Sequence, residues 1–196
     1  RPGKRHENAA GPVCLFPPTT QPVGMKTLFA TLLMSLLPLF GDAAEKLNVG
    51  AAIPDVTCND QDGKPVSLAK EGAKGYLLVY FYPKDDTSGC TKEAIEFNGL
   101  KDDFAKNDTI VIGMSPDSVK SHDKFKGKYG LDFPIAADED KSVLSAYGVW
   151  VEKSMYGKKY FGIERSTFLI DINGVIKKVW RKVSVPGHVQ EVLQEV

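Results

Sequence analysis

The sequence predicts an α/β fold in which helices cover both faces of a mixed β-sheet. Short apolar strands alternate with helical patterns along the chain, and Asn173-Gly174 joins two apolar runs near the C-terminus. Alternation favours parallel strands connected by helices, whereas Asn-Gly between apolar runs is typical of an antiparallel hairpin. With no repeat, low-complexity tract or internal linker, 196 residues of 42% hydrophobic content fit one packed domain.

The expected elements begin with a β-hairpin within residues 53–68, because Asp62-Gly63 supplies turn chemistry between two extended runs. An apolar run at 76–82 predicts a buried central strand, and apolar residues at helical spacing predict a helix over about 90–104. The remaining elements are a strand at 109–114, helices at 119–129 and 141–147, strands at 168–171 and 175–180, and a last helix at 188–196.

Cys90 lies where the central strand gives way to this first long helix. Pro83 ends the strand, a polar turn follows, and the cysteine falls in the first turn of the helix. Unpaired N–H groups and the helix dipole favour an anion there. A cysteine in such a place tends to have a pKa below the ~8.5 of a free thiol, so more of it is the attacking thiolate. The position therefore predicts a nucleophile rather than a buried structural thiol.

The spacing Pro83-x-x-x-Thr87-x-x-Cys90 resembles the active-site loop of peroxiredoxins. The longer stretch 80–94 is similar to the bacterioferritin-comigratory, or Q-type, subfamily. Far downstream, Arg165 immediately precedes an apolar strand, as in that family. Further agreement lies at residues 133–138 and 147–150.

The resemblance extends from about Leu47 to the C-terminus and implies a thioredoxin-like fold and a thiol peroxidase. The Cys90 thiolate would attack the terminal oxygen of hydrogen peroxide or an organic hydroperoxide and become a sulfenic acid. The expected chemistry needs no metal or organic cofactor. In agreement, no pair of Cys or His residues in the sequence has the spacing of a zinc site.

The resemblance also implies supporting roles for residues around the sulfur. Arg165 would hold its guanidinium against the sulfur and favour the thiolate, and Pro83 would shield it from water. The Thr87 hydroxyl and the backbone N–H groups of the loop around Gly89 would donate to thiolate or peroxide. Glu93 would steady the arginine. Each has an ordinary alternative: a helix N-cap for Thr87, a strand end for the proline, and solvated surface charges for the arginine and the glutamate.

Two positions depart from the family pattern. Ser88 stands where the loop usually has Pro, and Ile95 stands where many relatives carry a resolving cysteine. The helix expected at 119–129 also lacks Cys. We therefore expect a one-cysteine cycle in which a thioredoxin-like or glutaredoxin-like reductant reduces the sulfenic acid through a mixed disulfide. Cys58 is the only competitor in the mature chain, and we expect it to be a buried core residue rather than the partner of Cys90.

Two other functions are compatible with a cysteine at this place. A disulfide reductase or isomerase normally uses Cys-x-x-Cys, but Cys90 is followed by Thr91, Lys92 and Glu93. An exported peroxide sensor or holdase would use oxidation of Cys90 as a switch. Turnover separates these possibilities, because a sensor oxidises once whereas a peroxidase cycles.

The N-terminal part is set apart from the folded domain, which we expect at residues 45–196. Residues 25–44 have the basic start, apolar run and small residues of a secretory signal peptide. Export to the periplasm without stable membrane association is therefore expected. An uncleaved amphipathic anchor is the alternative, and the protein would be cytoplasmic if the segment is not functional. Residues 1–24 lack apolar periodicity, so we expect disorder and interpret them as an upstream extension or a long pre-sequence.

The charge balance limits the choice of partners. Lys and Arg number 25, Asp and Glu number 25, and the formal net charge is zero. Such a surface gives no reason to expect nucleic acid or an acidic membrane as partner. The subfamily resemblance favours a monomer.

Overall fold

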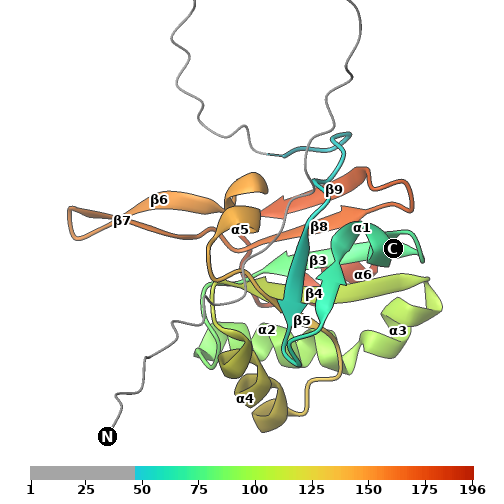
Figure 1. Cartoon of the computed structure of the whole chain (residues 1–196), viewed down its shortest axis with the longest axis horizontal. Coiled ribbons are helices and arrows are strands. Elements are labelled where there is room, and N and C mark those ends of the chain that lie inside the picture. The colour runs from blue at the N-terminus through green and yellow to red at the C-terminus, as the bar shows by residue number, and fades with distance from the viewer. Residues whose placement is uncertain (1–46) are drawn as a thin grey trace, which may run out of the picture.

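The computed structural model describes residues 47–196, and these form a seven-stranded mixed sheet with helices on both faces (Figure 1). Across the sheet the strands are β2 (Pro65–Ser67), β1 (Thr57–Asp60), β5 (Ile135–Ala137), β4 (Thr109–Ser115), β3 (Tyr76–Phe81), β8 (Ser166–Ile170) and β9 (Ile176–Arg181). The helices are α1 (Leu68–Gly72), α2 (Ser88–Gly99), α3 (Lys101–Lys106), α4 (Val119–Tyr129), α5 (Ser142–Ala146) and α6 (His188–Leu193).

The strand pairing confirms the predicted fold class. β3 pairs in parallel with β4, and β4 pairs in parallel with β5. The remaining pairs are antiparallel, including the expected hairpins β1–β2 and β8–β9. Because the chain runs β3–α2–α3–β4–α4–β5, helical crossovers separate the parallel strands, as the alternation of patterns predicted.

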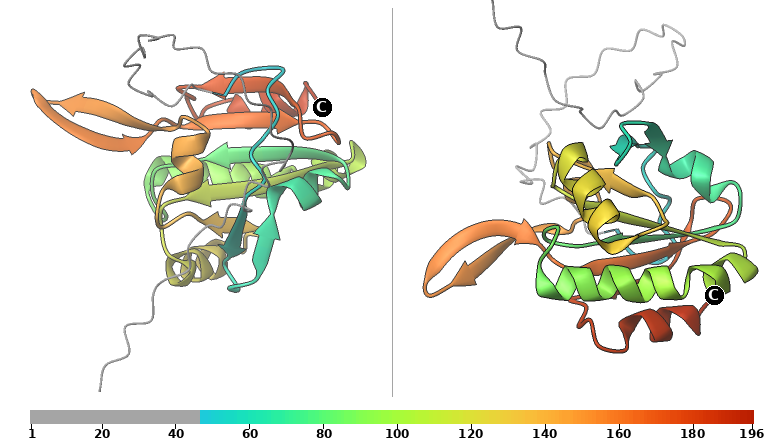
Figure 2. Two further views of the ribbon diagram at one scale, coloured as in Figure 1. Left: turned by 45° about the horizontal axis from the view of Figure 1, so that its top comes forward. Right: turned by 90° about the horizontal axis from the view of Figure 1, so that it is seen from below.

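The core is divided by the central strand β3, whose side chains alternate between two clusters. Leu77, Val79 and Phe81 pack with residues of α1 and α5, whereas Leu78 and Tyr80 pack with residues of α2, α3 and α6. Figure 2 shows α2 and α6 side by side on one side of the sheet, with α1 on the other. The strand that leads to Cys90 is therefore buried on both faces, which fixes its end firmly.

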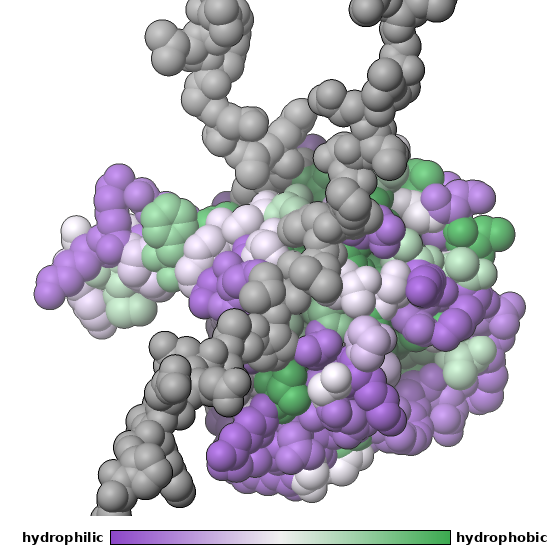
Figure 3. All heavy atoms as spheres, viewed as in Figure 1, coloured by the Kyte–Doolittle hydropathy of each residue, from purple (hydrophilic) through white to green (hydrophobic). Residues whose placement is uncertain are grey.

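A two-stranded arm of β6 (Trp150–Met155) and β7 (Lys158–Ile163) projects from the body (Figures 1 and 2). The sequence did not predict this hairpin, because most of its side chains are exposed and show no alternation of polar and apolar residues. Its turn contains Tyr156 and Gly157, both with positive φ, and Tyr156 is 98% exposed. Figure 3 shows hydrophobic and hydrophilic residues mixed along the arm.

The single helix expected over 90–104 was wrong. α2 ends at Gly99, and α3 begins at Lys101 after Leu100, whose φ of −107° and ψ of 8° leave the helical region. Glycine has a low helix propensity, which favours an end at this point. The short elements α1 and β5 were also not predicted, since three to five residues carry too little periodicity to be recognised.

The expectations for residues 1–24 and for the signal peptide at 25–44 lie outside the described residues, as do the first two residues of the expected domain. Within 47–196, no helix has the length and apolar character that crossing a bilayer requires.

Gly113 in β4 provides a test of core packing. A Cβ atom at this position would lie 2.8 Å from the hydroxyl oxygen of Tyr80, whose ring is buried and cannot move away. We expect Gly113→Ala to lower the free energy of unfolding by about 1–3 kcal/mol, the usual cost of overpacking. Urea denaturation measures this change. Gly99→Ala, where a Cβ atom meets open space, is the matched control and should leave stability unchanged or slightly raised.

Candidate active site

Cys90 occupies the predicted place, in the first turn of α2. β3 ends at Phe81, and α2 starts at Ser88 with Thr87 as its N-cap residue. The N–H of Thr91 donates to the carbonyl oxygen of Thr87 at 2.9 Å, so helical bonding begins around the cysteine. Cys90 is 2% exposed and is a free thiol. The strand and helix thus hold a nearly buried sulfur where unpaired helix N–H groups gather.

Arg165 reaches this sulfur from the other end of the chain. Its Nη2 donates to the Cys90 Sγ at 3.1 Å. The contact follows from strand register, because Phe81 at the end of β3 pairs with Ser166 at the start of β8. Antiparallel pairing therefore brings the residue before β8 beside the loop that follows β3, where the family resemblance implied it would lie.

Glu93 forms an ion pair with Arg165, through Oε2 and Nη1. The glutamate side chain is fully buried, and burial raises its pKa to about 7 even though Arg165 acts in the opposite direction. Burial also acts to lower the pKa of Arg165, but the charges of Glu93 and Cys90 outweigh it and hold the pKa above its usual value. The guanidinium therefore stays positive between the sulfur and the carboxylate.

The other loop residues lie around this group without all touching it. The Thr87 side chain makes no capping hydrogen bond and instead donates its hydroxyl to the carbonyl oxygen of Lys84 at 3.1 Å. Pro83 is exposed and lines a cavity together with Arg165. A Cβ atom on Gly89 would lie 3.7 Å from Nη2 of the arginine, which is ordinary contact, so packing alone does not require glycine there.

Cys58 is not on the same side of the sheet as Cys90. It is a buried residue of β1 and packs in the cluster that contains Val79, whereas Cys90 packs in the cluster that contains Tyr80. Adjacent residues of β3 face opposite sides, so the sheet itself separates the two cysteines.

Sequence reasoning missed a buried polar cluster beneath the loop. Asp85 Oδ1 accepts from the Tyr82 hydroxyl at 2.7 Å, and its Oδ2 lies 2.9 Å from His122 Nδ1 on α4. The contact between Asp85 and His122 was not predicted. The two residues are 37 positions apart, and no local pattern in the sequence signals their pairing.

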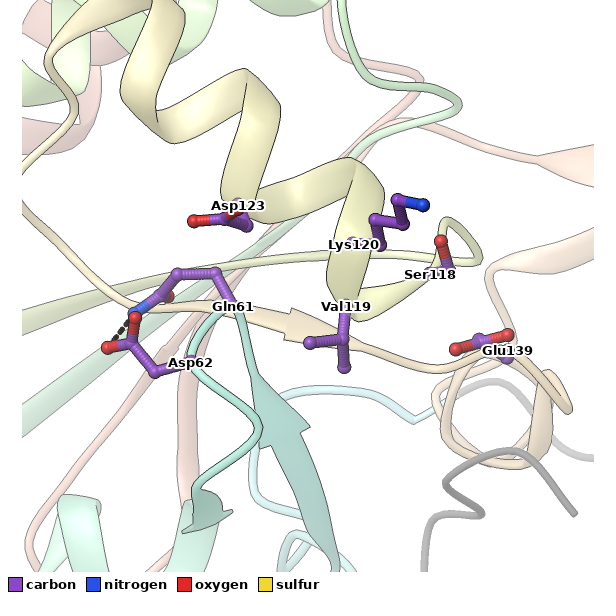
Figure 4. A pocket seen from close by; sticks show the side chains of 7 residues that line it. All are labelled: Gln61, Asp62, Ser118, Val119, Lys120, Asp123 and Glu139. Atoms are coloured by element: carbon purple, nitrogen blue, oxygen red, sulfur yellow. Dashed lines mark hydrogen bonds between the residues drawn. The ribbon is translucent and has the colours of Figure 1, made fainter. Parts of the chain in front are cut away.

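Several cavities lie near these elements. One of about 450 Å³ adjoins Arg165 and is lined by Pro83, Val151, Glu152, Lys153, Ile163, Glu164, Arg165, Lys182 and Val183. Another, of about 600 Å³, lies between the β1–β2 turn and the start of α4; Figure 4 shows its polar lining and the hydrogen bond between Gln61 and Asp62. Neither Cys90 nor Arg165 lines this second cavity. Within residues 47–196, no group of three or more His, Cys, Asp or Glu side chains is placed to hold a metal ion.

Known proteins are similar to this chain in sequence and in overall fold. Residues 49–179 match the AhpC/TSA family. Peroxiredoxin Bcp of Bacillus subtilis is 45% identical over 148 residues, which cover 76% of this chain and 94% of that protein.

Solved structures of the same group are similar to this chain in fold. A bacterioferritin comigratory protein of Xanthomonas campestris, studied for its alkyl peroxide reduction, has a TM-score of 0.68 and 43% identity, with 71% of this chain and 88% of that chain covered. A cysteine-to-serine variant of Xylella fastidiosa PrxQ has a TM-score of 0.73 and 39% identity, with 77% and 96% covered. The chain therefore belongs to the AhpC/TSA family, and it is a thiol peroxidase of the Bcp, or Q-type, peroxiredoxin group.

Proposed function

We propose that Cys90 is the residue that attacks the peroxide. The observation that carries this assignment is the 3.1 Å contact between Arg165 Nη2 and the Cys90 Sγ, in the first turn of a helix. The thiolate attacks the terminal oxygen of the peroxide, so that an S–O bond forms while the O–O bond breaks. The leaving oxygen takes up a proton and departs as water or an alcohol, and Cys90 remains as a sulfenic acid.

Arg165 stabilises this step because negative charge moves from sulfur to the leaving oxygen. Because Glu93 already holds the guanidinium in place, the guanidinium can stabilise the charge that develops on the leaving oxygen without reorganising. Thr87 is the exposed N-cap residue of α2, three positions before Cys90, and its hydroxyl exchanges the bond to Lys84 for one to the peroxide. Pro83 and Gly89 shape the loop, and Pro83 limits access of water to the thiolate.

The substrates we propose are hydrogen peroxide and organic hydroperoxides. The cavity of about 450 Å³ beside Arg165 offers more room than hydrogen peroxide needs. Its walls include Val151, Ile163 and Val183, which suit an alkyl group whose peroxide lies beside Arg165, the residue that contacts the sulfur.

We further propose that an external thiol completes the cycle. A thioredoxin-like or glutaredoxin-like protein attacks the sulfenic acid, water leaves, and a second thiol of the reductant cleaves the mixed disulfide. The separation of Cys58 from Cys90 by the sheet supports a one-cysteine cycle, as does Ile95 on the exposed side of α2. Export directed by residues 25–44 and a monomeric state remain proposals from the sequence.

Turnover tests the proposed function. The full-length protein should consume many equivalents of hydrogen peroxide or cumene hydroperoxide when thioredoxin or glutaredoxin and its NADPH-linked reductase are present. Cys90→Ser should lose this activity, and Cys58→Ser should keep it, because resolution does not use Cys58. NADPH oxidation is the measured quantity. Consumption of a single equivalent by the wild type would indicate a sensor instead, and loss of turnover in Cys58→Ser would contradict the one-cysteine cycle.

The buried carboxyl of Glu93 predicts a specific dependence of stability on pH. Because its folded pKa, about 7, exceeds the ordinary 4.5, the folded state binds more protons than the unfolded state between these values. The free energy of unfolding should therefore fall as pH rises through this window. Between pH 5 and 8 we expect the wild type to lose about 2–3 kcal/mol more than Glu93→Gln.

Urea denaturation at the two pH values measures this difference. Asp123→Asn, which removes an exposed carboxyl on α4, is the control and should follow the wild type. An identical pH dependence in the wild type and Glu93→Gln would show that the carboxyl is ionised throughout.

A further inference from the structure

Two successive aspartates fasten the loop before Cys90 to helix α4. The Asp85 carboxylate accepts from Ser121 Oγ at 2.7 Å and lies 2.9 Å from His122 Nδ1. The Asp86 carboxylate accepts from Lys128 Nζ at 2.7 Å and from the Tyr129 hydroxyl. The two pairs of α4 residues are seven positions apart, about two helical turns, so both contacts use one face of the helix.

The buried contact, at Asp85, holds the loop more rigidly than the exposed one. The Tyr82 hydroxyl donates to the Asp85 carboxylate at 2.7 Å. The backbone N–H of Asp85 donates to Asp117 Oδ2 at 2.8 Å. Burial acts to raise the pKa of Asp85, but hydrogen bonds from His122, Ser121 and Tyr82 outweigh it and leave the pKa below its usual value. The side chain and the backbone of Asp85 are therefore both fixed, between Pro83 and Thr87.

Among the donors to Asp85, His122 is unusual because it places a polar ring in a fully buried position. Its side chain is fully buried, and no partner for Nε2 exists among the residues that the structure describes. An imidazole there leaves a polar atom unsatisfied, which an apolar side chain would avoid. The benefit that offsets this cost is the contact of Nδ1 with Asp85.

We propose that His122 is a positioning residue for the peroxidase reaction, which acts by holding Asp85 and with it the loop from Pro83 to Thr87. The inference rests on the proposed role of Cys90 as the nucleophile. α2 begins directly after this loop, so a shift of the loop moves the first turn of α2, and the sulfur, relative to Arg165. Displacements of about 1 Å at a reacting group can cost on the order of 100-fold in rate.

The test compares two substitutions of His122 in the full-length protein. His122→Leu removes the donor to Asp85, whereas His122→Asn keeps an N–H close to the position of Nδ1. We measure the rate of Cys90 oxidation by hydrogen peroxide in single turnover, and the pH profile of Cys90 alkylation by iodoacetamide. We expect oxidation to slow roughly 10- to 100-fold in His122→Leu, with an altered alkylation profile, and the Asn variant to recover most of the rate.

Val143→Ala separates positioning from stability. Val143 is a fully buried residue of α5 in the core cluster on the other face of the sheet, so the substitution weakens the fold without touching the loop. Its melting temperature should fall while its oxidation rate stays at the wild-type value. If His122→Leu also keeps the wild-type rate and alkylation profile, His122 is only structural and the proposal is overturned.

Two further variants keep the outcome clear. If His122→Leu does not fold, Ser121→Ala removes a different donor to Asp85 and should slow oxidation in the same direction. An unchanged oxidation rate in Ser121→Ala would then overturn the proposal. Cys90→Ser separates a failure of the proposed peroxidase function from a failure of the positioning role of His122. Peroxide consumption that survives in Cys90→Ser contradicts the proposed function, whereas a fast wild type and an equally fast His122→Leu contradict only the positioning role.

Discussion

The guanidinium of Arg165 joins two parts of the chain that are 75 residues apart, and the site depends on that contact. It places a permanent positive charge 3.1 Å from a nearly buried sulfur, where solvent screening is weak. Glu93 on the same helix as Cys90 binds the other side of the guanidinium. A buried carboxylate without this partner would be expensive, and an unpaired buried arginine would be as well, so the three residues stabilise one another.

The sheet makes this contact possible. β3 is buried on both faces and pairs with β4 on one side and β8 on the other. The loop that contains Cys90 follows the end of β3. Because β3 and β8 are antiparallel, Arg165, just before β8, lies next to this loop. The loop is then held from the opposite side by α4 through Asp85 and Asp86. The position of the Cys90 sulfur therefore depends on the register of β3 and β8, on the start of α2, and on the hydrogen bonds between the loop and α4.

Much of this arrangement could be predicted from the sequence because its signals are local. The strand before Pro83, the helix after Thr87 and the Asn173-Gly174 hairpin all lie within short windows. The β6–β7 arm escaped prediction because its strands face solvent on most positions and follow no period of two. The Asp85–His122 pair escaped for a different reason: which residue of α4 meets the loop depends on how the helix packs, and a single sequence contains no signal of that register. Arg165 was singled out only because a family resemblance marked it, since nothing in its local sequence indicates a contact with Cys90.

The peroxidase chemistry proposed for Cys90 is tested by the product that forms on its sulfur. The most direct measurement is the intact mass of the reduced protein after one equivalent of hydrogen peroxide, with and without a trap for sulfenic acid, alongside Cys90→Ser. We expect one trapped adduct, located on Cys90 and missing in the variant. A disulfide between Cys58 and Cys90 would contradict the one-cysteine cycle, and an unmodified Cys90 after seconds of exposure would contradict its role as the nucleophile.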